Sequence, residues 1–241
     1  MAKIHMVLQG KGGVGKSLIA ALLAQYKIHQ GHKPLCIDTD PVNATFEGYK
    51  RLGATRLEIM DGDEINSRKF DALVEILASA KDDVIVDNGA SSFVQLSHYL
   101  VSNQVPQLLC EMGHELIVHT VITGGQALLD TANGFSQLVS QMPESVIFTV
   151  WLNPFWGPIE HDGKSFDHWK TYLANKSRIS AIVQIPTLKE ETYGTDLSEM
   201  LQERLTFDEA LSEEKRSIMT RQRLKIIRDR LFDQLGIATV I

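Results

Sequence analysis

Short apolar runs alternate along this chain with longer segments whose apolar residues recur at helical spacing. Five runs are typical of buried strands, at residues 4–8, 35–38, 83–87, 116–122 and 145–152. One further strand is expected to end at Ile185, and residues 54–60 alternate as a short edge strand does. Helical spacing predicts helices at about 15–30, 66–81, 93–113 with a break at Pro106, and up to Gln141. The alternation predicts an α/β fold with a doubly wound, mostly parallel sheet.

A glycine-rich loop joins the first apolar run to the first predicted helix. Its sequence, GKGGVGKS at 10–17, has the spacing of a phosphate-binding P-loop between a strand and a helix. Glycines let several backbone N–H groups point into one anion-sized hollow, and the helix dipole adds positive potential. Lys16 is expected to reach the β- and γ-phosphates, and the Ser17 hydroxyl to coordinate Mg²⁺. The predicted nucleotide contacts of this loop are Gly12, Gly13, Val14, Gly15, Lys16, Ser17 and Leu18.

Carboxylates follow two of the other predicted strands. Asp87 ends the run 83–87 in the manner of a Walker B aspartate, which holds Mg²⁺ through a water molecule. Asp38 ends the run 35–38, and Asp40 follows it. We expect that strand to lie next to the first one, so that both acids face the γ-phosphate at the carboxyl edge of the sheet. Asp40 has an alternative role, because Asp-Pro is also common at the start of a helix.

The lysine that directly follows the first glycine, in KGGVGKS, resembles the deviant Walker A ATPases of SIMIBI type, the family of the partition protein ParA and the division-site protein MinD. The resemblance implies that Lys11 reaches the partner's phosphates in an ATP-sandwich dimer, where a cation offsets charge during phosphoryl transfer. It implies that Asp38 orients a Mg²⁺-bound water or the nucleophile, and that Asp40 responds to the γ-phosphate. Two segments depart from the family: DPVNA at 40–44 replaces DPQGN, and 88–92 lacks the usual proline, so this loop is expected to be looser.

The same resemblance assigns the side of the site that receives the base. Asn153, after the run 145–152, matches the asparagine that bonds the adenine edge, and Pro186 matches the segment that flanks the base. An Asn-Pro turn is the alternative explanation of Asn153. Guanine is the rival base, because NKSR at 175–178 resembles N-K-x-D, but Arg178 only donates where guanine needs an acceptor. ATP is therefore the expected nucleotide.

Composition limits the class of protein. The 241 residues, 44% hydrophobic and 22% charged, fit a single P-loop ATPase domain over 1–241. A net charge of −6 argues against a globally basic nucleic-acid binder. The chain enters a strand almost at once and has no run of about 18 apolar residues, so neither a signal peptide nor a membrane span is expected. Because Cys36 and Cys110 form no C-x-x-C motif, a cytoplasmic location is expected.

Two segments leave alternatives open. The C-terminal helix, predicted over Ser212–Leu235 within the terminal part 212–241, carries an apolar stripe beside basic residues. This pattern suits a peripheral membrane surface or DNA phosphates, and the favoured alternative is a helix packed on the domain with a solvated charged face. The aromatic loop 155–163 fits either a partner-binding loop or one whose aromatic residues complete the core.

Together these features predict a Mg²⁺-dependent ATPase that acts as a nucleotide-switched homodimer. From KGGVGKSLIAALLAQY to WLNPFWGP, the chain resembles the TraL-type ATPases of broad-host-range conjugative plasmids. That resemblance implies a role in conjugative DNA transfer, beside the relaxosome or the type IV secretion machinery. Three alternatives stay open: a ParA/MinD-type partition or positioning ATPase, a small-molecule kinase or ligase, and a nucleotide-gated binding module with little turnover.

Overall fold

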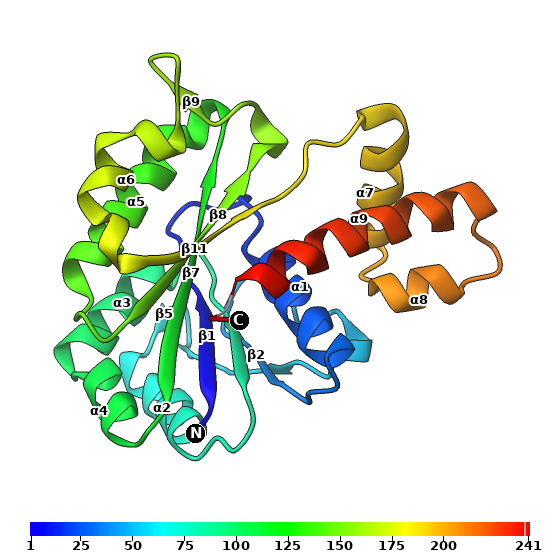
Figure 1. Ribbon diagram of the computed structural model, residues 1–241. Helices are drawn as coiled ribbons and strands as arrows, with labels where there is room; N and C mark the ends of the chain where they lie inside the picture. Colours follow the sequence, from blue (N-terminus) through cyan, green and yellow to red (C-terminus); the bar gives the residue numbers. More distant parts are fainter. Residues whose placement is uncertain (239) are drawn as a thin grey trace.

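A seven-stranded, wholly parallel sheet forms the centre of the computed structural model, which describes residues 1–238 and 240–241 (Figure 1). The strand order is β11-β8-β7-β1-β6-β2-β3. The strands are β1 (Lys3–Val7), β2 (Leu35–Asp38), β3 (Thr55–Arg56), β6 (Val84–Asp87), β7 (Glu115–Thr123), β8 (Ile147–Asn153) and β11 (Ile179–Gln184). The central strands are continuous apolar runs because helices cover both faces of the sheet.

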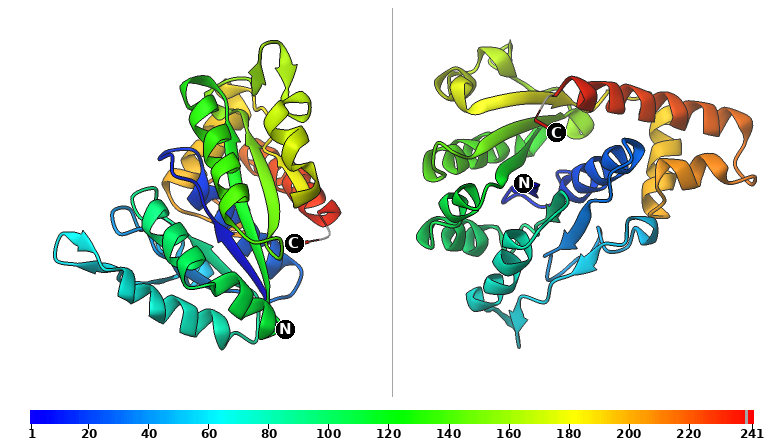
Figure 2. Two further views of the ribbon diagram at one scale, coloured as in Figure 1. Left: turned by 90° about the vertical axis from the view of Figure 1, so that its left-hand side faces the viewer. Right: turned by 60° about the horizontal axis from the view of Figure 1, so that its bottom comes forward.

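Helices pack on the two faces and enclose two apolar cores (Figure 2). One core receives side chains from α2 (Phe70–Ala78), α3 (Phe93–Ser102), α4 (Val105–Glu111), α5 (Leu128–Gln141) and α6 (Lys170–Asn175). The other receives side chains from α1 (Lys16–His29), α7 (Thr195–Gln202), α8 (Phe207–Ser212) and α9 (Ile218–Ile237). Two small hairpins lie outside the sheet: β4 (Met60–Asp61) with β5 (Glu64–Ile65), and β9 (Glu160–His161) with β10 (Lys164–Ser165).

The predicted α/β fold is confirmed, and several details are corrected. The strand 35–38 does not lie next to the first strand, because β6 stands between β1 and β2. The edge strand expected over 54–60 is limited to Thr55–Arg56, since Met60 already belongs to the hairpin. The helix break expected at Pro106 falls earlier, at 103–104, and Pro106 lies in the first turn of α4, where proline is tolerated.

The register of the central strands brings three predicted site elements to one edge. Val7 at the end of β1 lies opposite Asp87 of β6, and Asp87 lies opposite Asp38 of β2. On the other side of β1, Thr123 of β7 pairs with Asn153 of β8. The carboxyl ends of these parallel strands therefore surround the start of the P-loop.

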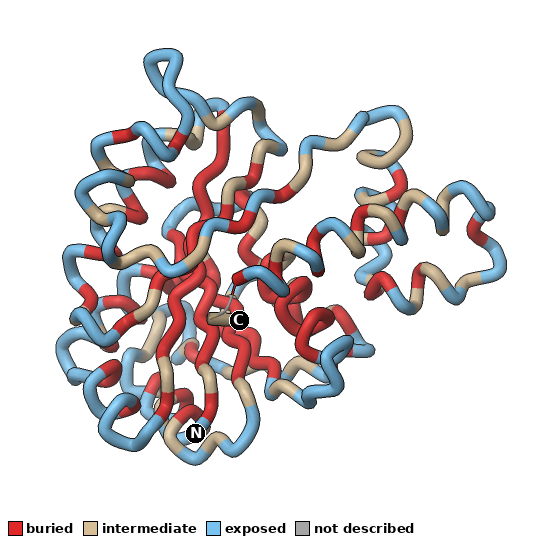
Figure 3. Tube along the Cα trace, viewed as in Figure 1, coloured by how far each residue is buried: buried red, intermediate tan, exposed pale blue. Residues whose placement is uncertain are grey.

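The C-terminal helix packs on the domain, as the favoured alternative predicts. Its apolar stripe, which includes Leu224, Ile227 and Leu231, is buried in the same core as α1 (Figure 3). The predicted bounds were wrong: α8 ends at Ser212, and α9 begins after Ser217, whose side chain accepts from the Thr220 N–H. Since the stripe is already covered, it does not offer an apolar face to a membrane.

Several basic residues near this helix have acidic partners. Arg216 pairs with Glu203 at 2.6 Å and with Glu213 at 2.7 Å. Arg228 pairs with Asp229 at 2.9 Å. The charges of Arg216 and Arg228 are therefore paired with acidic residues of the same chain. Within the described residues, no helix combines the length and the apolar character needed to cross a membrane.

Candidate nucleotide site

The glycine loop adopts a shape that glycine alone permits without strain. Gly13 and Gly15 have left-handed φ angles of 71° and 104°, and Gly15 caps the start of α1. A Cβ on Gly15 would lie 2.9 Å from the amide nitrogen of Asn153. The loop therefore needs glycine both for its backbone conformation and for its close approach to β8, and it leaves the N-terminus of a 14-residue helix facing the edge of the sheet.

Lys16 is held inside the loop that carries it. Its side chain is buried, and Nζ donates to the Lys11 carbonyl oxygen at 3.0 Å. Burial lowers the pKa of Lys16, while the nearby carboxylates of Asp87 and Asp40 act in the opposite direction. A buried ammonium group with carboxylates nearby is suited to receive phosphate oxygens.

Asp87 is a buried carboxylate without a hydrogen-bond partner. It is 1% exposed, and neither oxygen accepts a hydrogen bond from the described residues. Burial raises the pKa of Asp87 to about 7, although the nearby Ser17 hydroxyl and Lys16 act against that rise. An orphaned carboxylate beside the P-loop hydroxyl fits a divalent cation, which binds oxygen ligands. Within the described residues, no group of three or more Asp, Glu, His or Cys side chains could by itself hold a metal ion.

Asp38 and Asp40 hold the loop that follows β2. The two oxygens of Asp38 accept from the backbone N–H groups of Asp40 at 2.9 Å and Glu47 at 3.0 Å. Asp40 accepts from the N–H groups of Val42 and Asn43, so it closes a turn after Pro41. No helix begins at these described residues, so the alternative role of Asp40 at a helix start is wrong. The predicted action of both acids on the γ-phosphate and on a Mg²⁺-bound water stays a prediction.

A polar network that the sequence did not reveal connects the loops after β2 and β6. The Asn88 side-chain oxygen accepts from the hydroxyls of Thr39 at 3.1 Å and Ser92 at 2.9 Å, and all three residues are fully buried. A Cβ on Gly89 would lie 2.6 Å from the Asp40 carboxyl carbon. The two loops therefore touch, and a movement of one requires an adjustment of the other. The polar run after Asp87 was the available signal, but its partner loop is 49 residues away.

Lys11 forms an ion pair within its own chain. Its Nζ lies 2.8 Å from a carboxylate oxygen of Asp130 on α5, and both side chains are about half exposed. The buried Gln9 amide, which donates to carbonyl oxygens of Val121 and Thr131, ties the start of the P-loop to the same helix. Because exposed ion pairs contribute little free energy, Lys11 can exchange Asp130 for another anion at low cost.

Asn153 fastens β8 to the P-loop. Its amide nitrogen donates to the Val14 carbonyl oxygen at 2.9 Å, and its side-chain oxygen accepts from the Phe155 N–H at 3.2 Å. One amide proton is left to act on a base, so the adenine contact stays a prediction. Pro186 follows β11, where the Ile185 N–H bonds to the Leu152 carbonyl oxygen and so lies beside β8.

The guanine-like tetrad has a structural role. Arg178 precedes β11, and its guanidinium donates to the Pro143 carbonyl oxygen at 2.6 Å and to the Val139 carbonyl oxygen at 3.4 Å. It also lies over the Phe148 ring. The amino end of β11 is the wrong edge of the sheet for a base site.

The aromatic loop after Asn153 does not complete the core with its first two rings. Phe155 is 74% exposed and Trp156 is 57% exposed, which contradicts the core alternative for these residues. The Trp156 indole N–H donates to the Gly13 carbonyl oxygen at 3.2 Å. Sequence reasoning did not place Trp156 at the P-loop, because no local pattern encodes a contact across 143 residues.

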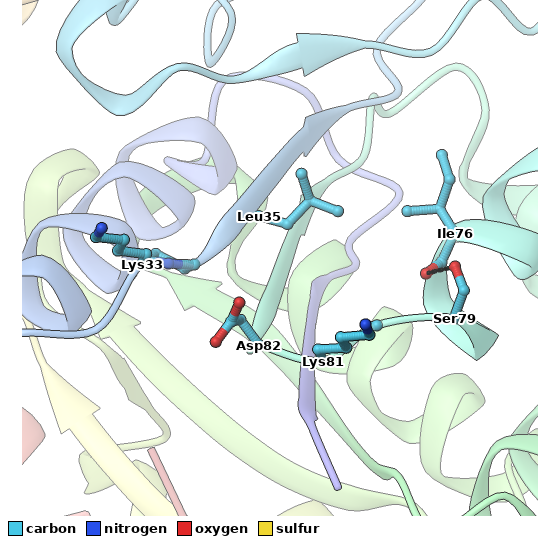
Figure 4. A pocket seen from close by; sticks show the side chains of 8 residues that line it. Lys33, Leu35, Ile76, Ser79, Lys81 and Asp82 are labelled. Carbon is cyan, nitrogen blue, oxygen red and sulfur yellow. Dashed lines mark hydrogen bonds between the residues drawn. The ribbon is translucent and has the colours of Figure 1, made fainter.

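A pocket of about 400 Å³ lies at the opposite edge of the sheet (Figure 4). Lys33 and Leu35 line it from one side, and Ile76 and Lys81 line it from the other. None of the predicted site residues contributes to this pocket, so it is separate from the P-loop edge.

Comparison with known proteins identifies the family. Residues 5–218 match the CobQ/CobB/MinD/ParA nucleotide-binding domain. A curated relative from Escherichia coli called Protein TraL is 72% identical over 241 residues, which is the full length of both chains. The fold is similar to MinD of Aquifex aeolicus, with a TM-score of 0.52, 16% identity and coverage of 96% of this chain and 98% of that chain. It is also similar to an AMPPNP-bound plasmid partition protein of Borrelia burgdorferi, with a TM-score of 0.50, 19% identity and coverage of 94% and 98%. The chain therefore belongs to the CobQ/CobB/MinD/ParA nucleotide-binding family, together with the proteins called TraL.

Proposed function

We propose that this protein is a Mg²⁺-dependent ATPase that closes into a homodimer around ATP and opens after hydrolysis. The observation that carries the proposal is Asp87, a buried carboxylate that accepts no hydrogen bond from the described residues and lies near the Ser17 hydroxyl and Lys16. Keeping such a group charged is costly, and a cation bound beside it would offset that cost. In this proposal the whole chain, 1–241, works as one unit.

The residues of the site divide the work. The amides of the P-loop and Lys16 bind the phosphates, and Asn153 and Pro186 lie on the side of the base. Ser17, with Asp87 and Asp38 through water, would hold Mg²⁺, which when bound neutralises charge on the β- and γ-phosphates. Asp38 and Asp40 orient the attacking water through the loop that they hold.

The two touching loops are the proposed switch. The γ-phosphate would bind Lys16 and the backbone N–H groups near Gly89, and so shift the loop that follows β6. The Thr39–Asn88–Ser92 network would then transmit this shift to the loop that follows β2. Lys11 would leave Asp130 and enter the partner's site, where its charge stabilises the transition state. The exposed Lys11–Asp130 pair supports this exchange, because breaking it costs roughly 1 kcal/mol or less.

The proposed cellular process is supported by the similar proteins and not by the geometry of the site. Full-length similarity to proteins called TraL supports a role in conjugative DNA transfer in the cytoplasm, with relaxosome or type IV secretion proteins as partners. The C-terminal helix, whose apolar stripe is packed in the core, gives no separate support to a membrane role. DNA binding is left to experiment.

Light scattering after size exclusion, combined with phosphate release, tests the ATPase dimer. We expect wild type to dimerise with Mg·ATP and to be monomeric with Mg·ADP. Lys16→Ala should lose nucleotide binding by about 30-fold or more, because it removes a buried charge-assisted contact. Lys11→Ala should bind ADP normally and lose both the dimer and hydrolysis, while the control Asp130→Asn should keep both.

Two results would contradict parts of this proposal. Equal phosphate release by wild type and Lys11→Ala would exclude the role of Lys11 in the partner's site. An ATP-bound dimer of the wild type that releases no phosphate would favour the binding module with little turnover. That alternative has one supporting observation, since both oxygens of Asp38 are occupied by backbone N–H groups.

A further inference from the structure

Trp156 presents an exposed ring next to the phosphate-binding loop. It ends the short 3-10 turn Pro154–Trp156, which follows β8 directly. Its N–H bonds to the Gly13 carbonyl oxygen at 3.2 Å, yet the residue is 57% exposed. A tryptophan that is fixed by its polar atom while much of its surface stays in water is suited to bind a flat apolar ligand.

Close backbone contacts fix the turn from behind. A Cβ on Gly124 would lie 2.1 Å from the Gly157 carbonyl oxygen, and a Cβ on Gly125 would lie 2.6 Å from the Trp156 carbonyl oxygen. The Gly157 N–H closes the turn on the Pro154 carbonyl oxygen at 3.0 Å. Phe155 packs edge-on against Trp156, with ring centroids 4.9 Å apart. The indole is therefore held in place before any ligand arrives, which lowers the entropy cost of binding.

The position of the ring relative to the P-loop indicates the ligand. The Trp156 indole N–H donates to the Gly13 carbonyl oxygen, and the Asn153 side-chain amide donates to the carbonyl oxygen of the next residue, Val14. The turn that carries Trp156 therefore starts from the residue already predicted to touch the base. In the proposed site the base lies on the side of Asn153 and Pro186, and Trp156 ends the turn that begins directly after Asn153.

We propose that Trp156 stacks on the base of the bound adenine nucleotide and forms one wall of the base pocket. The inference rests on the proposed nucleotide site and adds to it the residue that supplies affinity for the base. Every nucleobase has a π-face, so stacking on Trp156 does not select adenine. Selection is left to hydrogen bonds, for which Asn153 keeps one amide proton.

Isothermal titration with Mg·ADP and with Mg·pyrophosphate tests the stacking. ADP carries the base, pyrophosphate does not, and ADP lacks the γ-phosphate on which the proposed dimer depends. We expect Trp156→Ala to weaken ADP binding about tenfold to a hundredfold, as loss of base stacking does, and to leave pyrophosphate binding unchanged. Trp156→Phe should retain most of the ADP affinity, because it keeps a ring and loses the N–H. Leu173→Ala is the matched control, since Leu173 on α6 is 58% exposed, and it should bind both probes as wild type does.

Tryptophan fluorescence gives a second readout. Trp151 and Trp169 are buried, whereas Trp156 is open to a ligand, so ADP should change the emission of wild type and not that of Trp156→Phe.

Three outcomes would overturn the stacking. Equal losses of ADP and pyrophosphate affinity in Trp156→Ala would show that the indole only supports the P-loop through Gly13. Unchanged ADP affinity with a weaker ATP-dependent dimer would show that the ring contacts a second copy of the chain. If wild type binds pyrophosphate as tightly as ADP, base stacking is refuted while phosphate binding by the P-loop still holds. If wild type binds neither probe, the proposed nucleotide site itself is refuted.

Discussion

Two carboxylates flank the strand β6 and have opposite surroundings. Asp83, just before the strand, accepts from the Lys27 ammonium at 2.6 Å and from the Lys3 backbone N–H at 2.9 Å. Asp87, at its other end, is more deeply buried and accepts from no described residue. Burial alone would raise the pKa of Asp83, but its hydrogen bonds from Lys27 and Lys3 keep it below the usual value, whereas the pKa of Asp87 rises to about 7.

This difference between Asp83 and Asp87 distinguishes the two edges of the sheet: the amino edge stabilises the fold, and the carboxyl edge is suited to a ligand. At the amino edge the chain supplies the counter-charge together with the acid, so the pair is complete without any other molecule. At the carboxyl edge the described residues supply the acid, the P-loop and the left-handed glycines but no hydrogen-bond partner for the acid, which supports the proposed divalent cation there. The two acids thus differ in their partners as well as in their burial, because Asp83 has a cation and a backbone N–H and Asp87 accepts from no described residue.

Lys27→Ala should produce the largest loss of stability. Lys27 is 5% exposed, and its loss leaves Asp83 partly buried without a cation. We expect the free energy of unfolding to fall by about 3 kcal/mol, measured by urea denaturation. Nucleotide affinity, measured where the protein is folded, should not change. The exposed Lys33→Ala is the control, and a loss of less than about 0.5 kcal/mol in Lys27→Ala would show that the pair is not a structural anchor.

Asp87→Asn should remove a pH dependence of stability and should abolish Mg²⁺-dependent hydrolysis. The pKa of Asp87 is raised from 3.8 to about 7, so its favourable contribution is complete below pH 3.8 and is lost as the pH rises to 7. Each unit of the shift corresponds to about 1.4 kcal/mol. The unfolding free energy of the nucleotide-free wild type, minus that of Asp87→Asn, should therefore fall over this window.

The comparison with the variant is needed because other buried groups titrate nearby. Burial lowers the pKa of His119 to about 3 and lowers that of His5 as well. These groups destabilise the fold as the pH falls through the unfolded histidine pKa of about 6.5, which opposes the effect of Asp87. Both histidines are present in wild type and in the variant, so their contribution cancels in the difference. A difference that is flat from pH 4 to pH 7 would contradict the raised pKa.

The sequence predicts the parts of this contrast that depend on local patterns. The spacing of GKGGVGKS and the acid that ends the run 83–87 predict the P-loop and Asp87, because each pattern lies within a few consecutive residues. The position of β6 between β1 and β2 was missed, since strand order follows from tertiary pairing and not from the order of the runs. Lys11–Asp130 and Trp156–Gly13 were missed for the same reason, as their partners are 119 and 143 residues apart.

Asp38→Asn should give the smallest change in stability. Asp38 is intermediate between Asp83, which has a cation as partner, and Asp87, which accepts from no described residue. Asp38 is as buried as Asp87, but its partners are N–H groups of its own loop, at Asp40 and Glu47. An amide keeps one acceptor oxygen and places a donor against the other N–H, which should cost about 1–2 kcal/mol. The loss should be confined to the loop 39–47 and appear there as faster amide hydrogen exchange. The control Asp63→Asn, at an exposed turn, should match wild type. Uniformly faster amide exchange along all strands would contradict this local role and would show that Asp38, like Asp83, stabilises the whole fold.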